Sequence, residues 1–176
     1  VMVAFNDRIH AARTVTKCNS MNLDTFRSPE FGPLATRDES RIRWRAAMER
    51  TTPVELNPDR LTNRVAALTV TVDMFTGQIP APTECDALVF AATGAGHIPP
   101  SFITPLEEFS RADVPLVATT RCPEGRLARS TYDFLGSEAT LRELGCYYSD
   151  SNLQKARIET IVALAGDALE ETFDRP

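Results

Sequence analysis

A lysine set among hydroxyl and amide side chains is the first candidate for chemistry in this sequence. Lys17 follows Thr14 and Thr16 and precedes Asn19 and Ser20. An ammonium group surrounded by neutral polar side chains can be desolvated and lose its proton cheaply, which suits a group that accepts a proton in catalysis. The alternative is a solvated surface lysine, the commonest state of a lysine in a loop. The residues alone leave both interpretations open.

Hydroxyl groups near Lys17 are the candidate nucleophiles. Thr16 is adjacent to the lysine, but neighbouring side chains of an extended chain point to opposite faces, so it is a doubtful partner. Thr14 or Ser20 can serve instead. A hydroxyl nucleophile needs a base to activate it, and Lys17 is the candidate for that role.

A second candidate site follows the apolar run of residues 86–92. Its sequence is Thr93-Gly94-Ala95-Gly96-His97, and a helix is expected after it. Ligands of parallel sheets bind at the carboxyl ends of strands, where glycines allow close approach. The G-x-G spacing does not make a nucleotide site, because the third glycine and the distal acid are missing from the sequence. His97 is therefore either a ligand-binding residue or a structural one.

Arg121 closes the next apolar run, residues 114–119, and is followed by Cys122-Pro123. A guanidinium at the end of a strand can bind a carboxylate through two parallel hydrogen bonds. It can equally hold two loops together, and we favour that structural role.

The elements that must position these residues alternate between strands and helices after residue 64. We expect strands at 65–72, 86–92 and 114–119, a connector at 73–84, a helix at 102–111, a long loop, and a final helix that begins at a Ser151–Gln154 capping box and carries Ile158, Ile161, Val162 and Leu164 on one face. Apolar strands that alternate with helices predict an α/β fold with a parallel sheet covered on both faces, of the Rossmann-like or flavodoxin-like kind.

The preceding part of the chain predicts short strands and turns. Residues 1–5 have the pattern of a strand buried on both faces, residues 22–24 that of a brief helical turn, and residues 37–45 that of a hairpin. The predicted domains are a β-rich remnant of an N-terminal α/β domain at 1–45, a linker at 46–63 and a C-terminal α/β domain at 64–176. The start inside an apolar run suggests that an upstream half is absent.

Composition narrows the class of function. With 43% hydrophobic and 24% charged residues the chain is an ordinary globular protein, and its net charge of -5 argues against nucleic-acid and membrane partners. The two histidines are far apart and the four cysteines form no C-x-x-C pair, so we expect no metal and no cofactor. Reduced thiols in a cytoplasmic protein are the simplest expectation, although disulfides stay possible.

The segment around Lys17 resembles the part of bacterial-type L-asparaginases that carries their catalytic lysine. The residues that carry the resemblance are Asn6-Asp7, the run from Ile9 to Arg13, Val15-Thr16-Lys17, the run from Asp24 to Pro29, and the run from Phe31 to Leu34. The sequence departs from the family at Thr14, where the family usually has aspartate, and at Ala35, where it usually has glycine. The resemblance implies that Lys17 is the proton-accepting group.

Three further segments resemble the C-terminal domain of the same family. Thr93–His97 matches its G-x-G-[NH] turn, Thr119–Gly125 its [ST]-[ST]-R-[CV]-P-x-G segment, and Leu153–Ile158 the start of its last helix, with Leu153 in place of proline. The resemblance implies that His97 reaches into the active site of a neighbouring subunit, and Thr93, Gly94 and Gly96 of the same turn are further predicted substrate-binding residues. Tyr132 falls where the family contacts substrate across that interface, and Arg121 lies in a matched segment.

The family's T-G-G-T-I and H-G-T-D-T segments do not occur in this sequence. The first hypothesis is an L-asparaginase-like amidohydrolase that converts asparagine to aspartate and ammonia. Whether asparagine or glutamine is the preferred substrate stays open. The second is a catalytically incomplete asparaginase-like module for binding or oligomerisation, and a third is a small-molecule sensor. A homo-oligomer is expected under the first two, because uncovered strand edges and apolar faces favour association.

Overall fold

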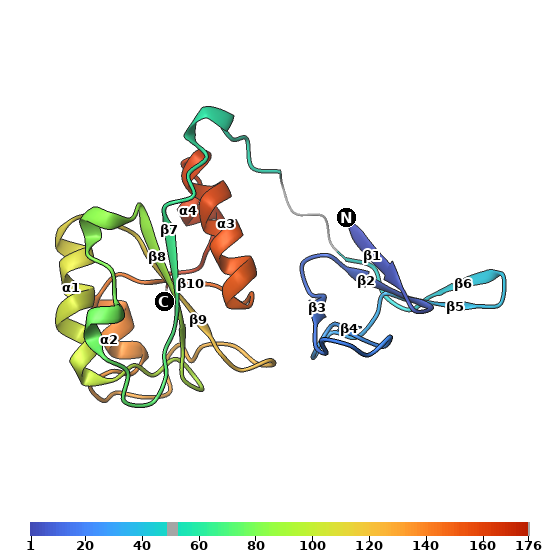
Figure 1. Ribbon diagram of the computed structural model, residues 1–176, viewed down its shortest axis with the longest axis horizontal. Coiled ribbons are helices and arrows are strands. Elements are labelled where there is room, and N and C mark those ends of the chain that lie inside the picture. Colours follow the sequence, from blue (N-terminus) through green and yellow to red (C-terminus); the bar gives the residue numbers. More distant parts are fainter. Residues whose placement is uncertain (49–52, 176) are drawn as a thin grey trace. The chain divides into compact units, whose positions relative to one another are not determined.

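The chain forms two compact units, Val1–Pro53 and Val54–Pro176, in a computed structural model that describes residues 1–48 and 53–175 (Figure 1). The described part of the first unit contains only strands, and all the helices of the described chain belong to the second. The predicted linker at 46–63 includes residues 49–52, which lie outside the described residues, and the predicted domain boundaries stay a proposal.

Unit 1 is built from short antiparallel strands. They are β1 (Met2–Phe5), β2 (Arg8–Ala11), β3 (Thr16–Lys17), β4 (Phe26–Arg27), β5 (Ala35–Asp38) and β6 (Arg41–Trp44). Four of them form one sheet in the order β1-β2-β5-β6, while β3 and β4 pair with each other. The predicted hairpin at 37–45 is present as β5 and β6.

The first strand differs from its prediction in burial. β1 pairs antiparallel with β2 at the edge of the sheet, and Met2, Ala4 and Phe5 are exposed. Within this unit the prediction of burial on both faces is wrong, because β1 has a strand on one side only and no layer covers it. The predicted end of this strand at residue 5 is confirmed: Asn6 and Asp7 follow it, and both have positive φ (46° and 57°), the backbone of a two-residue hairpin turn.

Unit 2 is an α/β unit around a four-stranded parallel sheet. Its elements are β7 (Val65–Thr69), β8 (Ala87–Ala92), α1 (Ile103–Arg111), β9 (Leu116–Thr120), α2 (Glu138–Glu143), β10 (Tyr147–Tyr148), α3 (Leu153–Ala165) and α4 (Leu169–Thr172), with short 3-10 turns at Pro58–Arg60, Thr76–Gln78, Pro82–Glu84 and Pro100–Phe102. The strand order is β10-β9-β8-β7 and every pair is parallel. The predicted fold class is thereby confirmed.

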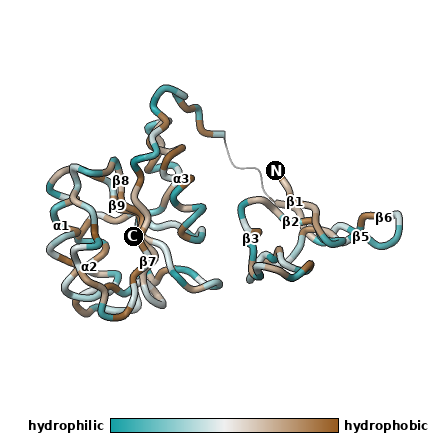
Figure 2. Tube along the Cα trace, viewed as in Figure 1, coloured by the Kyte–Doolittle hydropathy of each residue, from teal (hydrophilic) through white to brown (hydrophobic). Residues whose placement is uncertain are grey.

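The sheet of unit 2 lies between two helical layers, with α1 and α2 on one face and α3 on the other (Figures 1 and 2). In β8, Leu88 and Phe90 pack in the core that includes α1 and α2, whereas Val89 packs in the core that includes α3. All six residues of β8 are buried. A strand between two helical layers must be apolar on both faces, which explains why its sequence has no polar alternation.

The final helix is present where the sequence predicts it, but its capping residue and its buried face differ from the prediction. Asn152, not Ser151, caps α3, and its side chain accepts the N–H of Lys155 (3.1 Å). Ser151 instead donates to Glu159. Ile158, predicted for the apolar face, is 55% exposed, while Ala156 is buried against the sheet. Small side chains take the inner face because they let the helix approach the strands closely.

Two elements, α2 and β10, lie inside the segment that the sequence predicts as a long loop. They span only six and two residues. Elements this short do not complete the hydrophobic repeat on which the prediction of helices and strands depends.

Candidate functional site

Lys17 lies at the end of the short β3–β4 ladder of unit 1. It pairs with Phe26, and its side chain is exposed. Lys17, Cys18, Asn19 and Ser20 line a shallow depression on this unit. The expected desolvation of Lys17 is therefore not provided by unit 1, whereas the expected proximity of Ser20 is present.

The loop after Lys17 is held by hydrogen bonds between side chains and backbone. Oδ1 of Asn19 accepts the N–H groups of Met21 (2.9 Å) and Asn22 (2.8 Å), and the Thr25 hydroxyl donates to the Asn19 carbonyl. The predicted helical turn at residues 22–24 is wrong, because these bonds give the backbone N–H groups an alternative to helical partners. The loop that carries Ser20 is fixed without any regular structure.

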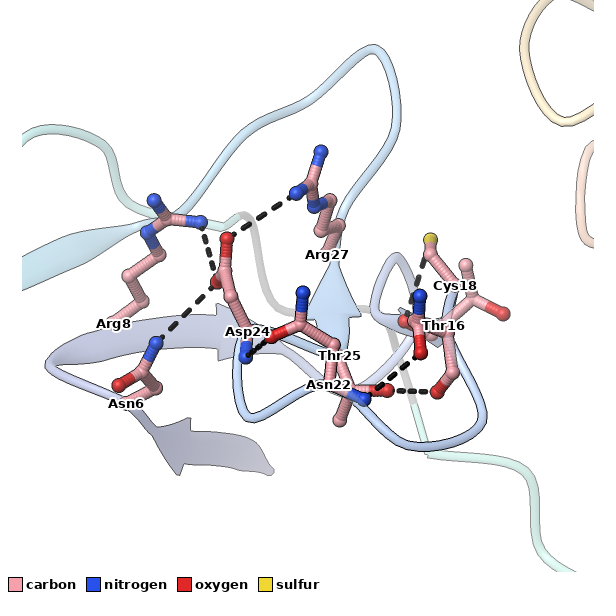
Figure 3. A network of polar contacts seen from close by, with 9 residues as sticks. Asn6, Arg8, Thr16, Cys18, Asn22, Asp24, Thr25 and Arg27 are labelled. Carbon is pink, nitrogen blue, oxygen red and sulfur yellow. Dashed lines mark hydrogen bonds and ion pairs between the residues drawn. The ribbon is translucent and has the colours of Figure 1, made fainter.

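Asp24 connects this loop to the main sheet of unit 1 (Figure 3). Its carboxylate accepts from Arg8 of β2 (3.0 Å) and Arg27 of β4 (3.2 Å), and Asn6 lies at 3.5 Å. The carboxylate thus holds the β3–β4 ladder against the β1–β2 hairpin. In the sequence, Asp24 stands out only as the first residue of the run from Asp24 to Pro29 that carries the family resemblance, and no role is predicted for it.

Thr14 is hydrogen-bonded away from the depression. Its hydroxyl donates to Ser28 Oγ (3.1 Å), which in turn lies 2.9 Å from Nδ1 of the buried His10. Burial, and then the nearby charge of Arg8, lower the pKa of His10, so the imidazole is neutral at pH 7. Of the candidate nucleophiles, Ser20 lies beside Lys17 in the depression, whereas the Thr14 hydroxyl is hydrogen-bonded to Ser28, which also contacts the buried His10.

In unit 2 the turn Thr93–His97 caps the carboxyl end of β8. The Thr93 hydroxyl and backbone N–H both donate to the His97 carbonyl (2.9 and 3.0 Å), and Gly94 and Gly96 have positive φ (52° and 116°). Thr120, at the end of β9, donates to the Gly94 carbonyl (2.6 Å). The turn is thus closed on itself and fastened to the neighbouring strand.

The His97 ring packs against two aromatic rings of the segment before α2. The centroid of Tyr132 lies 4.8 Å from that of His97, at an interplanar angle of 86°, and the centroid of Phe134 lies at 4.9 Å. Edge-to-face contacts of this kind are worth about 0.5–1.5 kcal/mol each beyond the area that they bury. Two predicted substrate-binding residues, His97 and Tyr132, are therefore in direct contact.

Glu138, the first residue of α2, supports this aromatic group. It is fully buried, and Oε1 accepts the backbone N–H groups of Thr131 and Tyr132. Burial raises the pKa of Glu138, but N–H donors from Tyr132, Glu138 itself and Thr131 outweigh burial and hold the pKa below its ordinary value. Nothing in the sequence singled out Glu138 or Phe134, because neither belongs to a motif or a periodic element.

Arg121 joins the ends of three strands. Its side chain donates to the Val70 carbonyl after β7 (3.1 Å) and its backbone N–H to the Ala92 carbonyl of β8 (3.0 Å). These bonds support the structural role that the sequence favoured. A role for Arg121 in carboxylate binding stays a prediction.

The predicted site residues form two groups in different units. Lys17 and Ser20 share the depression of unit 1, with Thr16 on the same short ladder, and Thr93, Gly94, Gly96, His97 and Tyr132 share the strand-end region of unit 2.

Across residues 1–48 and 53–175, no group of three or more histidine, cysteine or acidic side chains is suited to bind a metal ion. None of the helices in those ranges is long and apolar enough to cross a membrane.

This combination defines a class of protein: an α/β unit with a glycine turn and a histidine at its strand ends, preceded by a β unit that presents a lysine loop. Family profiles agree with the class. The profile described as "Glutaminase/Asparaginase C-terminal domain" matches residues 64–174, and "Asparaginase, N-terminal" matches residues 1–50. The chain belongs to the glutaminase/asparaginase family.

Individual relatives cover nearly all of this chain but only part of their own length. The L-asparaginase of Bacillus licheniformis is 28% identical over 93% of this chain and 51% of its own. The probable L-asparaginase of Deinococcus radiodurans is 33% identical over 99% of this chain and 54% of its own. The crystal structure of a probable cytoplasmic L-asparaginase from Campylobacter jejuni superposes with a TM-score of 0.79 at 25% identity, over 99% of this chain and 55% of its own. The chain thus spans about half the length of the relatives it matches.

Proposed function

We propose that this chain takes part in L-asparaginase-type hydrolysis of the side-chain amide of asparagine. In this reaction the C–N bond of the amide breaks, a C–O bond to water forms, and the nitrogen leaves as ammonia. The observation that carries the proposal is the exposed Lys17 on a fixed loop beside Ser20, in a chain of the asparaginase family. Lys17 is the proposed proton acceptor, and Ser20 is the hydroxyl of this chain best placed to be activated by it.

The exposure of Lys17 sets a condition on this proposal. A lysine accepts a proton readily at neutral pH only when its charged form is disfavoured, and burial is the commonest cause. Because unit 1 leaves Lys17 exposed, the substrate or another protein surface has to cover the depression during the reaction. His97 and Tyr132 of a second copy are the proposed contributors of substrate contacts, which makes a homo-oligomer part of the proposal.

The test is ammonia release from asparagine and from glutamine by the purified 176-residue chain. Lys17→Met should abolish release, and Arg41→Met, which removes an exposed cation of the same unit, should not change it. Equal rates for wild type and Lys17→Met would remove Lys17 from the mechanism. The ratio of the two rates decides whether asparagine or glutamine is the preferred substrate.

The second candidate function is an incomplete module that needs another chain. The absence of T-G-G-T-I and H-G-T-D-T segments from this sequence favours it. By the resemblance, the first segment carries the family's nucleophilic threonine, and the second carries a further threonine and an aspartate. Under this proposal the chain alone releases no ammonia, and activity appears on mixing with a separate chain that bears both segments. No binding and no activity on mixing would count against it.

The proposed location is the cytoplasm. Cys18 and Cys122 are exposed thiols, which a reducing compartment keeps free of disulfides. No partner other than a small amino acid and further copies of the chain is part of this proposal.

A further inference from the structure

The contact between His97 and Tyr132 depends on how the segment 130–137 is held. This segment has no strand or helix, so its backbone N–H groups need other partners. The Phe134 N–H donates to the Ser137 hydroxyl (3.2 Å) and the Gly136 N–H to the Thr140 hydroxyl (2.9 Å). These two bonds fix the part of the segment next to α2.

The part that carries Tyr132 is fixed by a carboxylate. Oε1 of Glu138 accepts both the Thr131 and the Tyr132 N–H, and the Ser137 hydroxyl donates to the Tyr132 carbonyl (3.3 Å). Glu138 is 0% exposed. A carboxylate is rarely buried to this degree without a charged partner, so its position here demands a specific explanation.

The backbone bonds of Glu138 have a direct consequence for the aromatic group. They set the backbone from which the Tyr132 ring reaches the His97 ring at 4.8 Å, and the same ring lies 5.8 Å from that of Phe134. A bond from the Ile98 N–H to the Gly136 carbonyl (2.9 Å) ties the residue after His97 to the same segment. The three rings are therefore held from both sides.

We propose that Glu138 is a positioning residue that holds Tyr132 against His97 and so pre-organises the strand-end site of unit 2. This inference rests on the proposed function for its catalytic meaning, but its structural content does not require any activity. The lowered pKa of Glu138 fits a carboxylate that stays ionised and accepts both N–H groups at neutral pH. Oε2 of Glu138 and Nε2 of His97 are both buried and have no hydrogen-bond partner among the described residues, which leaves the N–H groups on Oε1 as the contacts of Glu138 with the segment.

The first test measures the His97 ring by proton NMR in the intact chain. His10 and His97 are the two histidines of the sequence, so two sets of imidazole signals are expected, and a His97→Asn variant assigns them. Ring currents of Tyr132 and Phe134 should move the His97 signals away from the values of an exposed histidine. Glu138→Met, which keeps the side-chain volume but removes the acceptor, should return them toward the values of an exposed histidine.

Two control variants make the result specific. Glu138→Gln retains an acceptor oxygen and should keep the ring-current shift of His97, and Glu143→Gln, at the exposed end of α2, should leave that shift unchanged. Protection of the buried Cys146 thiol verifies that unit 2 of each variant is folded. An unchanged His97 shift in a folded Glu138→Met variant would overturn the proposal.

A measurement on wild type covers the case in which Glu138→Met does not fold. The Thr131 and Tyr132 amide protons should exchange with solvent slowly, although both residues are exposed and belong to no helix or strand. Fast exchange at both positions would show that Glu138 does not hold them and would overturn the proposal independently of any variant.

The kinetic test separates this inference from the proposed function. If the chain, alone or after mixing, hydrolyses asparagine, Glu138→Met should raise KM about tenfold while kcat changes less, because it disturbs binding residues rather than the lysine. An unchanged KM in a folded variant would contradict the positioning role. If wild type shows no activity, the proposed function fails while the NMR and exchange experiments still decide the role of Glu138.

Discussion

At the scale of single residues, two carboxylates organise the two predicted groups. Asp24 ties the Lys17 loop to the sheet of unit 1 from a partly exposed position, and Glu138 ties the Tyr132 segment to α2 from a fully buried one. Exposed ion pairs contribute about 0–1 kcal/mol, whereas hydrogen bonds to a buried charge contribute more, about 1.5–3 kcal/mol. Glu138 is therefore the residue whose chemistry should be visible in the stability of the chain.

The stability supplied by Glu138 should depend on pH with a defined sign. Its pKa in the folded chain lies below the ordinary value of 4.5, so folding favours the ionised form. The stabilisation is then complete above pH 4.5 and is lost as the pH falls through the lower, folded pKa. We expect wild type to exceed Glu138→Gln in free energy of unfolding by a constant amount near pH 7 and by less in acid.

Circular dichroism at the helical minimum measures this difference in urea. It follows unit 2, because the described helices all belong to that unit, while fluorescence of Trp44, the one tryptophan of the sequence, follows unit 1. Subtracting the variant removes the titration of the other carboxylates. A difference that stays the same from neutral pH to below the folded pKa would contradict the assignment.

At the scale of elements, the turn before α2 is tightly constrained at Gly136. Gly136 has a φ of 90°, and a Cβ at this position would overlap the Ile98 carbonyl oxygen. The same carbonyl region borders the His97 turn, since Ile98 donates its N–H to Gly136. The start of α2 and the strand-end site are thus coupled through one backbone contact.

A pair of glycine variants separates backbone strain from this overlap. Gly145→Ala has positive φ (71°) but open space around the added methyl group, so it should cost about 1–2 kcal/mol. In Gly136→Ala the added methyl group also overlaps a backbone oxygen. This variant should therefore lose about 1–3 kcal/mol more in free energy of unfolding than Gly145→Ala. Helical circular dichroism during urea unfolding measures both. Equal losses in the two variants would show that the Ile98 carbonyl gives way at little cost.

At the scale of the whole molecule, the four thiols divide into two classes. Cys18 and Cys122 are exposed, whereas Cys85 and Cys146 are buried. Burial raises the pKa of both buried thiols, and most strongly that of Cys146. Since the thiolate is the reactive form, we expect two thiols to react with a disulfide reagent at once and two only after unfolding.

Cys18→Ser and Cys122→Ser should each remove one equivalent from the fast phase. Cys85→Ser should leave two equivalents in the fast phase and remove one equivalent from the phase that is seen only in denaturant. Four thiols reacting at one rate in the folded chain would contradict the burial of Cys85 and Cys146.

The exposed apolar side chains of unit 1 predict self-association. Met2, Phe5, Phe31 and Trp44 are between 42% and 67% exposed. Because large apolar side chains on one small unit favour burial against another surface, we expect light scattering to detect oligomers at micromolar concentration. A monodisperse monomer under those conditions would contradict the prediction and the proposed role of a second copy.

The elements that the sequence predicted well depend on local patterns. The runs that became β8 and β9 are apolar throughout, and Asn6-Asp7 and the 37–45 hairpin carry turn residues whose backbone preferences act over two to four positions. The prediction of Lys17 as a candidate likewise used only its neighbours in the sequence and the family resemblance. None of these inferences required a contact between distant residues.

The tertiary structure alone decided which residues hold the candidate sites. The contact of His97 with Tyr132, the acceptance of the Tyr132 N–H by Glu138, the tie from Arg121 to Val70 and the ion pairs of Asp24 each join positions separated by several to many residues. Such contacts arise when the sheet order and the loop paths bring side chains together, and no spacing along the chain encodes them. The same reason explains why the sequence, which predicts Lys17 as a candidate, overestimated its burial: desolvation is a property of the surroundings in space, and unit 1 leaves this lysine in water.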